Sequence, residues 1–245
     1  MHDEVTNVIK LSGVIVAVAM VGSAFAGDAM GQSNGPFGQG ENRAVRHNDV
    51  VFENYRFRDG ETLAEVRIHY ATVGEPRRNK EGQVDNAVLV LHWTGSDSRV
   101  LLTPQYMHAL FDPGRPLDSN RYYLIFADSV GHGRSSKPSD ALRSRFPNYG
   151  YGDIVDLQHK LIVETLGIKR LHAILGMSMG GMNAWQWAEA YPDAVDGIMP
   201  VVSLPISISG RNLIWRHLAT TIPIGRTATI RSRSVAGPRR ISCCA

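Results

Sequence analysis

A serine lies between two glycines in the segment Gly176-Met177-Ser178-Met179-Gly180. Apolar residues at 171–175 come before it, and the segment 179–191 has the composition of a helix. A strand, then Gly-x-Ser-x-Gly, then a helix is typical of a turn that exposes a nucleophilic serine hydroxyl. The N–H of Met179, at the helix N-terminus, could then stabilise the oxyanion formed when Ser178 attacks a carbonyl carbon. The alternative is a glycine-rich turn around an ordinary serine. The other loops of the chain are needed to choose between these two interpretations.

A second loop, rich in small and polar residues, follows the apolar run at 86–91. Such a run is typical of a strand buried on both faces of a parallel sheet, and here it ends in His92-Trp93-Thr94-Gly95-Ser96. The backbone N–H groups of a small, glycine-containing loop can point at an anion. We expect the N–H of Trp93 to be the second oxyanion donor, with that of Thr94 as the alternative. His92 is expected to make structural hydrogen bonds, and its use as a catalytic base is the less favoured interpretation.

A third loop, Asp128-Ser129-Val130-Gly131-His132-Gly133-Arg134-Ser135, follows the apolar segment 122–127. Its glycines allow a sharp turn beneath the edge of the sheet at which the other two loops lie. Asp128 is expected to hydrogen-bond this loop. We interpret Asp128 and His132 as structural residues, and catalysis by either side chain is the alternative.

Strands and helices alternate along most of the chain. Val66, Ile68 and Tyr70 alternate with polar neighbours and Asp59-Gly60 is a turn signal, which together predict an antiparallel hairpin. The expected strands are 50–57, 63–73, 86–91, 122–127, 171–176 and 198–204, and the expected helices are 101–111, 153–166 and 179–191. This alternation predicts an α/β fold with a doubly wound, mostly parallel sheet. The polar segment 136–151 is expected to be a long loop that shapes a substrate entrance.

The composition is that of a globular protein with one sizeable α/β domain, because 43% of its 245 residues are apolar and 20% are charged. The formal net charge of +3 comes from residues 211–245, which hold seven arginines and no acidic residue. The other residues carry 19 basic and 23 acidic side chains, so we expect no nucleic-acid partner. Cys243 and Cys244 are adjacent, a spacing that suits neither a disulfide nor a metal site. The sequence shows no metal-ligand cluster and no phosphate-binding loop, so we expect no metal or nucleotide cofactor.

The N-terminal segment 1–26 has the features of an export signal. Lys10 precedes an apolar stretch that is short for a transmembrane helix, and Ala24-Phe25-Ala26 fits a small-x-small cleavage site. Asp3 and Glu4 weaken the positive charge before the stretch, so an uncleaved membrane anchor or a later translation start is the alternative. We expect a cleaved signal and a periplasmic or secreted protein, with 27–49 as a flexible lead-in.

Together the three loops resemble the α/β-hydrolase superfamily. Their order is His-Trp-Thr-Gly at 92–95, Asp-x-x-Gly-His-Gly-x-Ser-Ser at 128–136 and Gly-Met-Ser-Met-Gly-Gly-Met at 176–182. Leu-Thr-Pro-Gln at 102–105, Phe146-Pro147 and the segment 205–215 are similar to the homoserine O-acetyltransferase-like branch. The resemblance extends over residues 45–216. It implies the α/β-hydrolase fold for the core at 50–216, with its C-terminal part incomplete.

The resemblance also implies acyl transfer through a serine acyl-enzyme. Ser178 would attack the carbonyl of a small-molecule ester or acyl donor, and the N–H groups of Met179 and Trp93 would hold the oxyanion. The acceptor is water in an ester hydrolase and an alcohol in an O-acetyltransferase. The transferases tend to have one more residue in the loop at 92–95, and acetyl-CoA is cytoplasmic, so the short loop and the export signal both favour a hydrolase.

The catalytic triad is expected to be incomplete. In this superfamily the acid and then the histidine follow the serine in the chain, and after Ser178 the chain offers Asp193, Asp196 and His217. The two aspartates come before the next strand, which is too early, and His217 precedes the expected cap. We therefore expect impaired activity.

The segment 217–245 loses apolar periodicity and becomes an aberrant, Arg-rich tail that we expect to be disordered. Our hypothesis for this composition is an out-of-frame reading of a homologous gene. The alternatives to an impaired enzyme are a catalytically inactive fragment, a binding protein that retains the fold, and an enzyme whose acid and base come from a partner chain.

Overall fold

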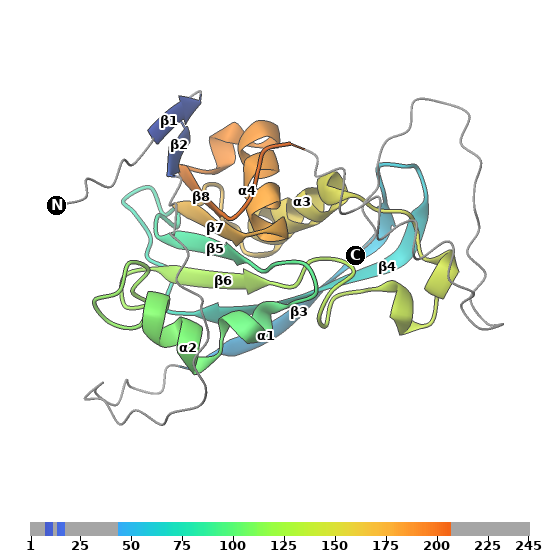
Figure 1. Ribbon diagram of the computed structural model, residues 1–245, viewed down its shortest axis with the longest axis horizontal. Helices are drawn as coiled ribbons and strands as arrows, with labels where there is room; N and C mark the ends of the chain where they lie inside the picture. Colours follow the sequence, from blue (N-terminus) through green and yellow to red (C-terminus); the bar gives the residue numbers. More distant parts are fainter. Residues whose placement is uncertain (1–7, 12–13, 18–43, 207–245) are drawn as a thin grey trace.

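The computed structural model describes residues 8–11, 14–17 and 44–206, which form one 8-stranded sheet with helices on both faces (Figure 1). The strands are β1 (Val8–Leu11), β2 (Val14–Ala17), β3 (Arg46–Arg56), β4 (Thr62–Val73), β5 (Ala87–Leu91), β6 (Tyr123–Ala127), β7 (Ala173–Met177) and β8 (Gly197–Val201). Their order across the sheet is β1-β2-β8-β7-β5-β6-β4-β3.

The centre of the sheet is parallel. β6, β5, β7 and β8 are parallel neighbours, whereas β4 is antiparallel to β6 and β3 is antiparallel to β4. β5 lies in the middle and all five of its residues, AVLVL, are buried. This arrangement confirms the expected doubly wound, mostly parallel sheet, and it brings the carboxyl ends of β5, β6 and β7 to one edge.

The helical segments form two layers, one on each face of the sheet (Figure 1). They are α1 (Ser98–Leu101), α2 (Pro104–Tyr106), α3 (Tyr151–Lys160) and α4 (Met179–Ala190), with π-helical turns at Met107–Phe111 and Leu161–Thr165 and 3-10 turns at Pro138–Asp140, Arg143–Arg145 and Pro192–Ala194. Trp187 of α4 and Leu157 of α3 belong to the core on one face, together with Ile174 of β7. Leu101 and Phe111 pack with Phe126 of β6 on the other face. Each face therefore has its own apolar core.

The single helix expected at 101–111 is wrong, because the segment is broken into α1, α2 and a π-helical turn. Thr103 has extended backbone angles, φ −68° and ψ 152°, between α1 and α2. Pro104 follows as the first residue of α2, where its missing N–H costs nothing, but it disfavours a helical conformation for the residue before it.

The predicted β-hairpin is confirmed as β3 and β4, and Gly60 at its turn has a φ of 94°. β3 begins at Arg46, inside the segment expected to be a flexible lead-in, and β8 ends at Val201 rather than at residue 204. β1 and β2 lie within the segment expected to be an export signal. They pair with each other, and β2 also pairs with β8. The remainder of that segment, most of the lead-in and the tail at 217–245 lie outside the described residues.

Candidate active site

Ser178 occupies a strained position between a strand and a helix. β7 ends at Met177 and α4 begins at Met179, and Ser178 between them has φ 51° and ψ −111°. Residues other than glycine rarely adopt such backbone angles. Where they do, the surrounding structure holds the conformation. Here the N–H of Ser178 donates to the carbonyl of Val201 at 2.9 Å, so β8 holds the turn. Ser178 is partly accessible, as a nucleophile must be.

Glycine is required where α4 crosses β7. A Cβ added to Gly176 would lie 2.1 Å from the carbonyl oxygen of Gly180. That oxygen belongs to the main chain, so the contact could not be relieved without shifting the helix or the strand. The Gly-x-Ser-x-Gly pattern therefore allows the first turn of α4 to approach β7 closely enough to close the turn at Ser178.

The loop after β5 lies against the same helical turn. Leu91 of β5 is in register with Gly176 of β7. A Cβ on Gly180 would lie 2.6 Å from the carbonyl oxygen of Leu91 and 2.7 Å from that of His92. Trp93 follows His92 directly, so the structure brings Trp93 and Ser178 to the same edge of the sheet.

Met179 is the first residue of α4. The first N–H groups of a helix have no acceptor within the helix, and the helix dipole favours negative charge beside them. The start of α4 at Met179 and the loop that contains Trp93 therefore lie at the same edge of the sheet. The Trp93 ring packs beside that of Tyr106, with 5.9 Å between their centroids, which ties this loop to α2.

The His92 ring is held by two backbone groups. Its Nε2 accepts the N–H of Ser129 at 3.1 Å, and its Nδ1 lies 3.0 Å from the carbonyl oxygen of Trp93. The residue is 1% exposed, and burial lowers the pKa of His92, which keeps the ring neutral. Both nitrogens are occupied, so the expected structural role is confirmed and the ring has no free nitrogen to act as a base.

Asp128 ties the loop after β6 to α1. Its Oδ1 accepts the N–H of Ser98 at 2.7 Å and its Oδ2 accepts the N–H of Arg134 at 2.8 Å. These bonds are the structural role expected of Asp128. The neighbouring His132 has Nδ1 at 3.4 Å from the carbonyl of Val130, and its buried Nε2 has no partner among the described residues. Burial also lowers the pKa of His132.

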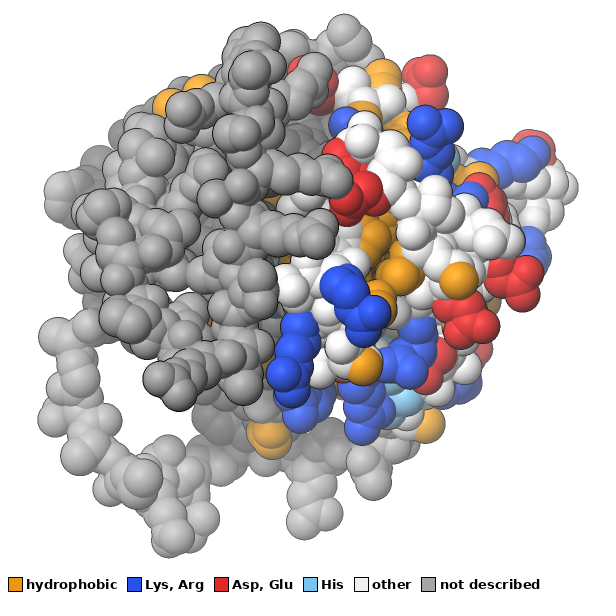
Figure 2. Space-filling model, turned by 90° about the vertical axis from the view of Figure 1, so that its right-hand side faces the viewer, with side chains coloured by type: hydrophobic (Ala, Val, Ile, Leu, Met, Phe, Trp, Pro, Cys, Tyr) orange, Lys and Arg blue, Asp and Glu red, His pale blue; other side chains and the backbone are white. Residues whose placement is uncertain are grey.

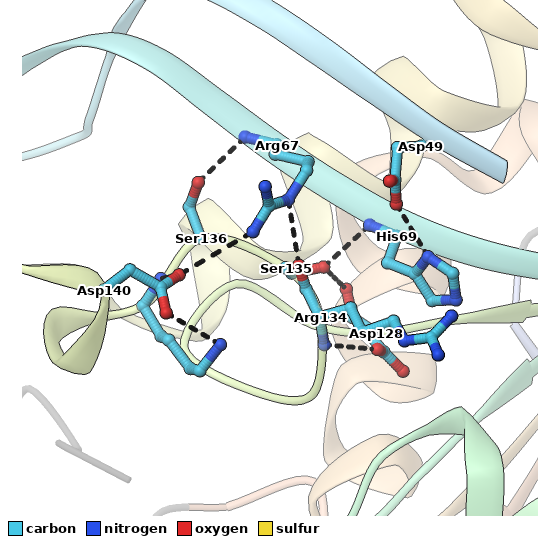
Figure 3. A network of polar contacts seen from close by, with 9 residues as sticks. Asp49, Arg67, His69, Asp128, Arg134, Ser135, Ser136 and Asp140 are labelled. Carbon is cyan, nitrogen blue, oxygen red and sulfur yellow. Dashed lines mark hydrogen bonds and ion pairs between the residues drawn. The ribbon is translucent and has the colours of Figure 1, made fainter.

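An Asp–His pair that the sequence reasoning missed lies on β3 and β4 (Figure 3). Asp49 Oδ1 is 2.7 Å from His69 Nδ1, and His69 Nε2 is 3.3 Å from Nδ1 of His47. The N–H of His69 donates to Ser135 Oγ, which donates in turn to the carbonyl of Asp128. A signal was present in the sequence, because Asp49 and His69 are equally far from the hairpin turn at Asp59 and so pair across the strands.

This Asp–His pair is too far away to activate Ser178. β4 is separated from β7 by β6 and β5. Three strand spacings amount to about 14 Å. The pair therefore joins β3 to β4 within the hairpin and does not reach Ser178.

Asp193 and Asp196 lie at the wrong end of β8. Asp196 comes immediately before Gly197, the first residue of β8, and Asp193 lies in the preceding 3-10 turn, whereas the Ser178 N–H bonds the carbonyl of Val201 at the far end. Five residues of strand span about 16 Å. Asp196 forms an ion pair with Arg170 there. His217 lies outside the described residues.

The described part of the chain contains no group of three or more His, Cys, Asp or Glu side chains that could hold a metal ion. None of the helices in that part is both long enough and apolar enough to cross a membrane.

Known proteins that are similar to this chain identify the class of protein to which it belongs. Residues 105–219 match the family described as "alpha/beta hydrolase fold". The fold is similar to that of an acetyl esterase, MekB, with a TM-score of 0.61 and 26% identity, covering 71% of this chain and 49% of that one. It is also similar to a homoserine O-acetyltransferase from Bacillus anthracis, with a TM-score of 0.58 and 26% identity, covering 69% of this chain and 49% of that one. The chain is therefore a protein of the α/β-hydrolase fold.

Within that class its sequence is similar to homoserine O-acetyltransferases. It is 33% identical to the enzyme of Leptospira meyeri over 68% of this chain and 46% of that protein. It is 34% identical to the enzyme of Haloarcula marismortui over 73% of this chain and 48% of that protein. A probable acyltransferase of Methanothermobacter thermautotrophicus is 35% identical over 62% of this chain and 46% of that protein. The chain thus spans just under half of the length of these relatives.

Proposed function

We propose that this chain carries the nucleophile and the oxyanion donors of a serine acyl-transfer enzyme. In a complete enzyme of this kind, Ser178 Oγ attacks the carbonyl carbon of an ester or thioester, and its proton goes to a base. The alcohol or thiol leaves with a proton, and the acyl group stays on Ser178 until water or an alcohol accepts it. The N–H groups of Met179 and Trp93 stabilise the oxyanion formed on the way. The observation that carries this proposal is the strained backbone of Ser178 at the junction of β7 and α4.

The proposed substrate is a small-molecule ester or acyl donor, and hydrolysis is favoured over transfer to an alcohol. The relatives named as homoserine O-acetyltransferases support acyl transfer. The short His92-Trp93-Thr94-Gly95 loop supports the hydrolase. On the face shown in Figure 2, basic and acidic side chains lie next to one another. That mixture does not suggest a site for a polyanion on the described part of this face.

We propose further that turnover is impaired. The support for this is that Asp193 and Asp196 precede β8, at the edge of the sheet away from Ser178. A chain without its base retains a weakly nucleophilic serine, because the hydroxyl proton has no acceptor in the transition state. The competing proposal, an inactive fragment or a binding protein with this fold, rests on the same observation.

We also propose export, to the periplasm or the medium, with a membrane-anchored form as the alternative. The support is the sequence of residues 1–26. Intact mass measurement of the protein from its native host tests it, because cleavage after Ala26 would leave Gly27 as the first residue.

A fluorophosphonate probe tests the proposed nucleophile. We expect slow, stoichiometric labelling of the wild-type protein that is lost in Ser178→Ala and retained in Ser139→Ala, an exposed serine outside the site. Peptide mass spectrometry would locate the label. Labelling that persists in Ser178→Ala would contradict the assignment, and a folded wild-type protein that takes no label would favour the inactive fragment.

A further inference from the structure

His92 lies where three loops meet. Its ring accepts a hydrogen bond from Ser129 in the loop after β6, and it contacts the carbonyl of Trp93 in its own loop after β5. Its main-chain carbonyl oxygen lies against Gly180, in the first turn of α4. One buried residue therefore touches the loop that follows each of the three central strands.

The contacts fix the tautomer of the ring. The backbone N–H of Ser129 can only donate, so Nε2 of His92 must carry a lone pair. The single proton of the neutral ring is then on Nδ1, and Nδ1–H donates to the carbonyl of Trp93 at 3.0 Å. A second proton on Nε2 would face another donor across 3.1 Å. The site therefore selects the neutral Nδ1–H form.

The same contacts orient both peptide groups that flank Trp93. The peptide between His92 and Trp93 has its carbonyl against Gly180, and the peptide between Trp93 and Thr94 has its carbonyl on the His92 ring. The N–H of a trans peptide points away from its carbonyl. Fixing the two carbonyls therefore fixes the directions of the N–H groups of Trp93 and Thr94, which are the two candidate donors of this loop.

We propose that His92 is a positioning residue that acts as a neutral Nδ1–H imidazole and holds the loop after β5 so that its backbone N–H meets the oxyanion formed at Ser178. This inference rests on the proposed function, because it needs an oxyanion at Ser178. His92 touches neither substrate nor nucleophile, and it acts through the peptide groups of Trp93.

Two substitutions separate positioning from folding. His92→Gln places an amide oxygen near the position of Nε2, so it can still accept from Ser129, but it has no donor for the carbonyl of Trp93. His92→Asn places an amide N–H near the position of Nδ1, so it can still donate to Trp93, but it cannot reach Ser129. We expect His92→Gln to keep most of the thermal stability and to lower the rate of labelling of Ser178 by fluorophosphonate about 100-fold, the effect of losing one oxyanion donor. We expect the opposite pattern for His92→Asn, a lower Tm and a labelling rate within a few-fold of wild type.

The test combines those rates and melting temperatures with a long-range ¹H–¹⁵N spectrum of the histidine rings of the wild-type protein. The expected spectrum has one ring, absent in both variants, in the Nδ1–H form from pH 6 to pH 9. A wild-type spectrum in which no histidine ring has the Nδ1–H form would overturn the proposal even if neither variant folds, and so would a folded His92→Gln protein that is labelled at the wild-type rate. A folded wild-type protein that takes no label at Ser178 marks failure of the proposed function itself, and the positioning role falls with it.

Discussion

At the scale of single residues, Ser178 combines a proposed chemical role with a conformational cost. Its φ of 51° and ψ of −111° lie in a region that costs a residue with a Cβ about 1–3 kcal/mol. The conformation persists because the Ser178 N–H is bonded to Val201 and because the glycines beside it admit the first turn of α4. The site therefore stores strain at the residue proposed to do the chemistry.

The strain can be measured by substitution. We expect Ser178→Gly to be more stable than Ser178→Ala by about 1 kcal/mol, because glycine relieves the strain by more than it adds to the entropy of the unfolded chain. Urea denaturation of the two variants measures the difference. At the exposed Ser139 the same pair should rank the other way, with glycine less stable than alanine. Equal stabilities of the two Ser178 variants would show that the turn is not strained.

At the scale of elements, two sets of contacts hold the parts of the fold around Ser178. One is the packing of α4 on β7, and the other joins the β3–β4 hairpin to α3 and α4. Asp156 of α3 receives two hydrogen bonds from the Arg58 guanidinium, at 2.7 and 2.8 Å, and one from the Tyr191 hydroxyl at 2.8 Å. One carboxylate thus joins the turn of the hairpin, α3 and the end of α4. The close contact between α4 and β7 is at Gly176, which lies against the main chain of Gly180.

Gly176→Ala tests the crossing of α4 over β7. The new methyl group would meet the main-chain oxygen of Gly180, so we expect a loss of about 1–3 kcal/mol of unfolding free energy, together with slower labelling of Ser178. Gly150→Ala is a suitable control, since a Cβ there would have nothing within 4 Å, and the change should cost about 0.5 kcal/mol because alanine is a poorer N-cap of α3 than glycine. Chemical denaturation compares the variants, and equal losses at both positions would refute the steric argument.

The lowered pKa of Asp156 predicts how the free energy of unfolding depends on pH. Burial acts to raise the pKa of Asp156, but the hydrogen bonds from Arg58 and Tyr191 outweigh it, and the pKa is lowered overall. A carboxyl group whose folded pKa is depressed stabilises the fold above its unfolded pKa, about 3.9, and that stability is lost as the pH falls through the folded value.

We therefore expect Asp156→Asn to be less stable than wild type at pH 7 and to lose less stability between pH 5 and pH 2. Urea denaturation over this range measures both effects. Asp193→Asn, at an exposed position, should follow the wild-type curve. Parallel curves for Asp156→Asn and wild type would show that the Arg58–Asp156 pair does not couple to folding.

At the scale of the whole molecule, the chain assembles the edge of the sheet that holds Ser178 but, within its described residues, no acid–base pair beside it. The Asp49–His69 pair lies three strands away, and Asp193 and Asp196 lie at the opposite edge. The chain spans just under half of the length of its relatives.

We expect acylation of Ser178 without sustained turnover. Enzymes of this kind that lose the base are slowed by a factor of about 10⁴–10⁶, so hydrolysis of p-nitrophenyl acetate should barely exceed the background rate measured with Ser178→Ala. Rapid multiple turnover that disappears in Ser178→Ala would show that a base is present. His217→Asn would then test the one histidine that follows Ser178 in the chain.

Much of the fold could be predicted because the signals were local. The apolar run that became β5, the Asp59-Gly60 turn and the helix after Ser178 all depend on residues close together in the chain. The expected helix at 101–111 failed because the steric effect of Pro104 on Thr103 outweighed the apolar pattern. The Asp49–His69 contact was missed because a charged residue and a histidine twenty positions apart carry no signal until the hairpin register is counted.

The sequence by itself determined the order and identity of the three loops, and hence the candidate nucleophile Ser178 and the class of fold, because those features are patterns of glycine, serine and apolar residues along the chain. The tertiary structure decided what each histidine and aspartate near them does. His92 proved to be a buried, doubly hydrogen-bonded ring, Asp128 an acceptor for two backbone N–H groups, and Asp196 a residue of the opposite edge. The physical reason is that the role of an ionisable side chain depends on its distance to its partners and on its burial, and both are set by strands that are neighbours in the sheet and distant in the sequence.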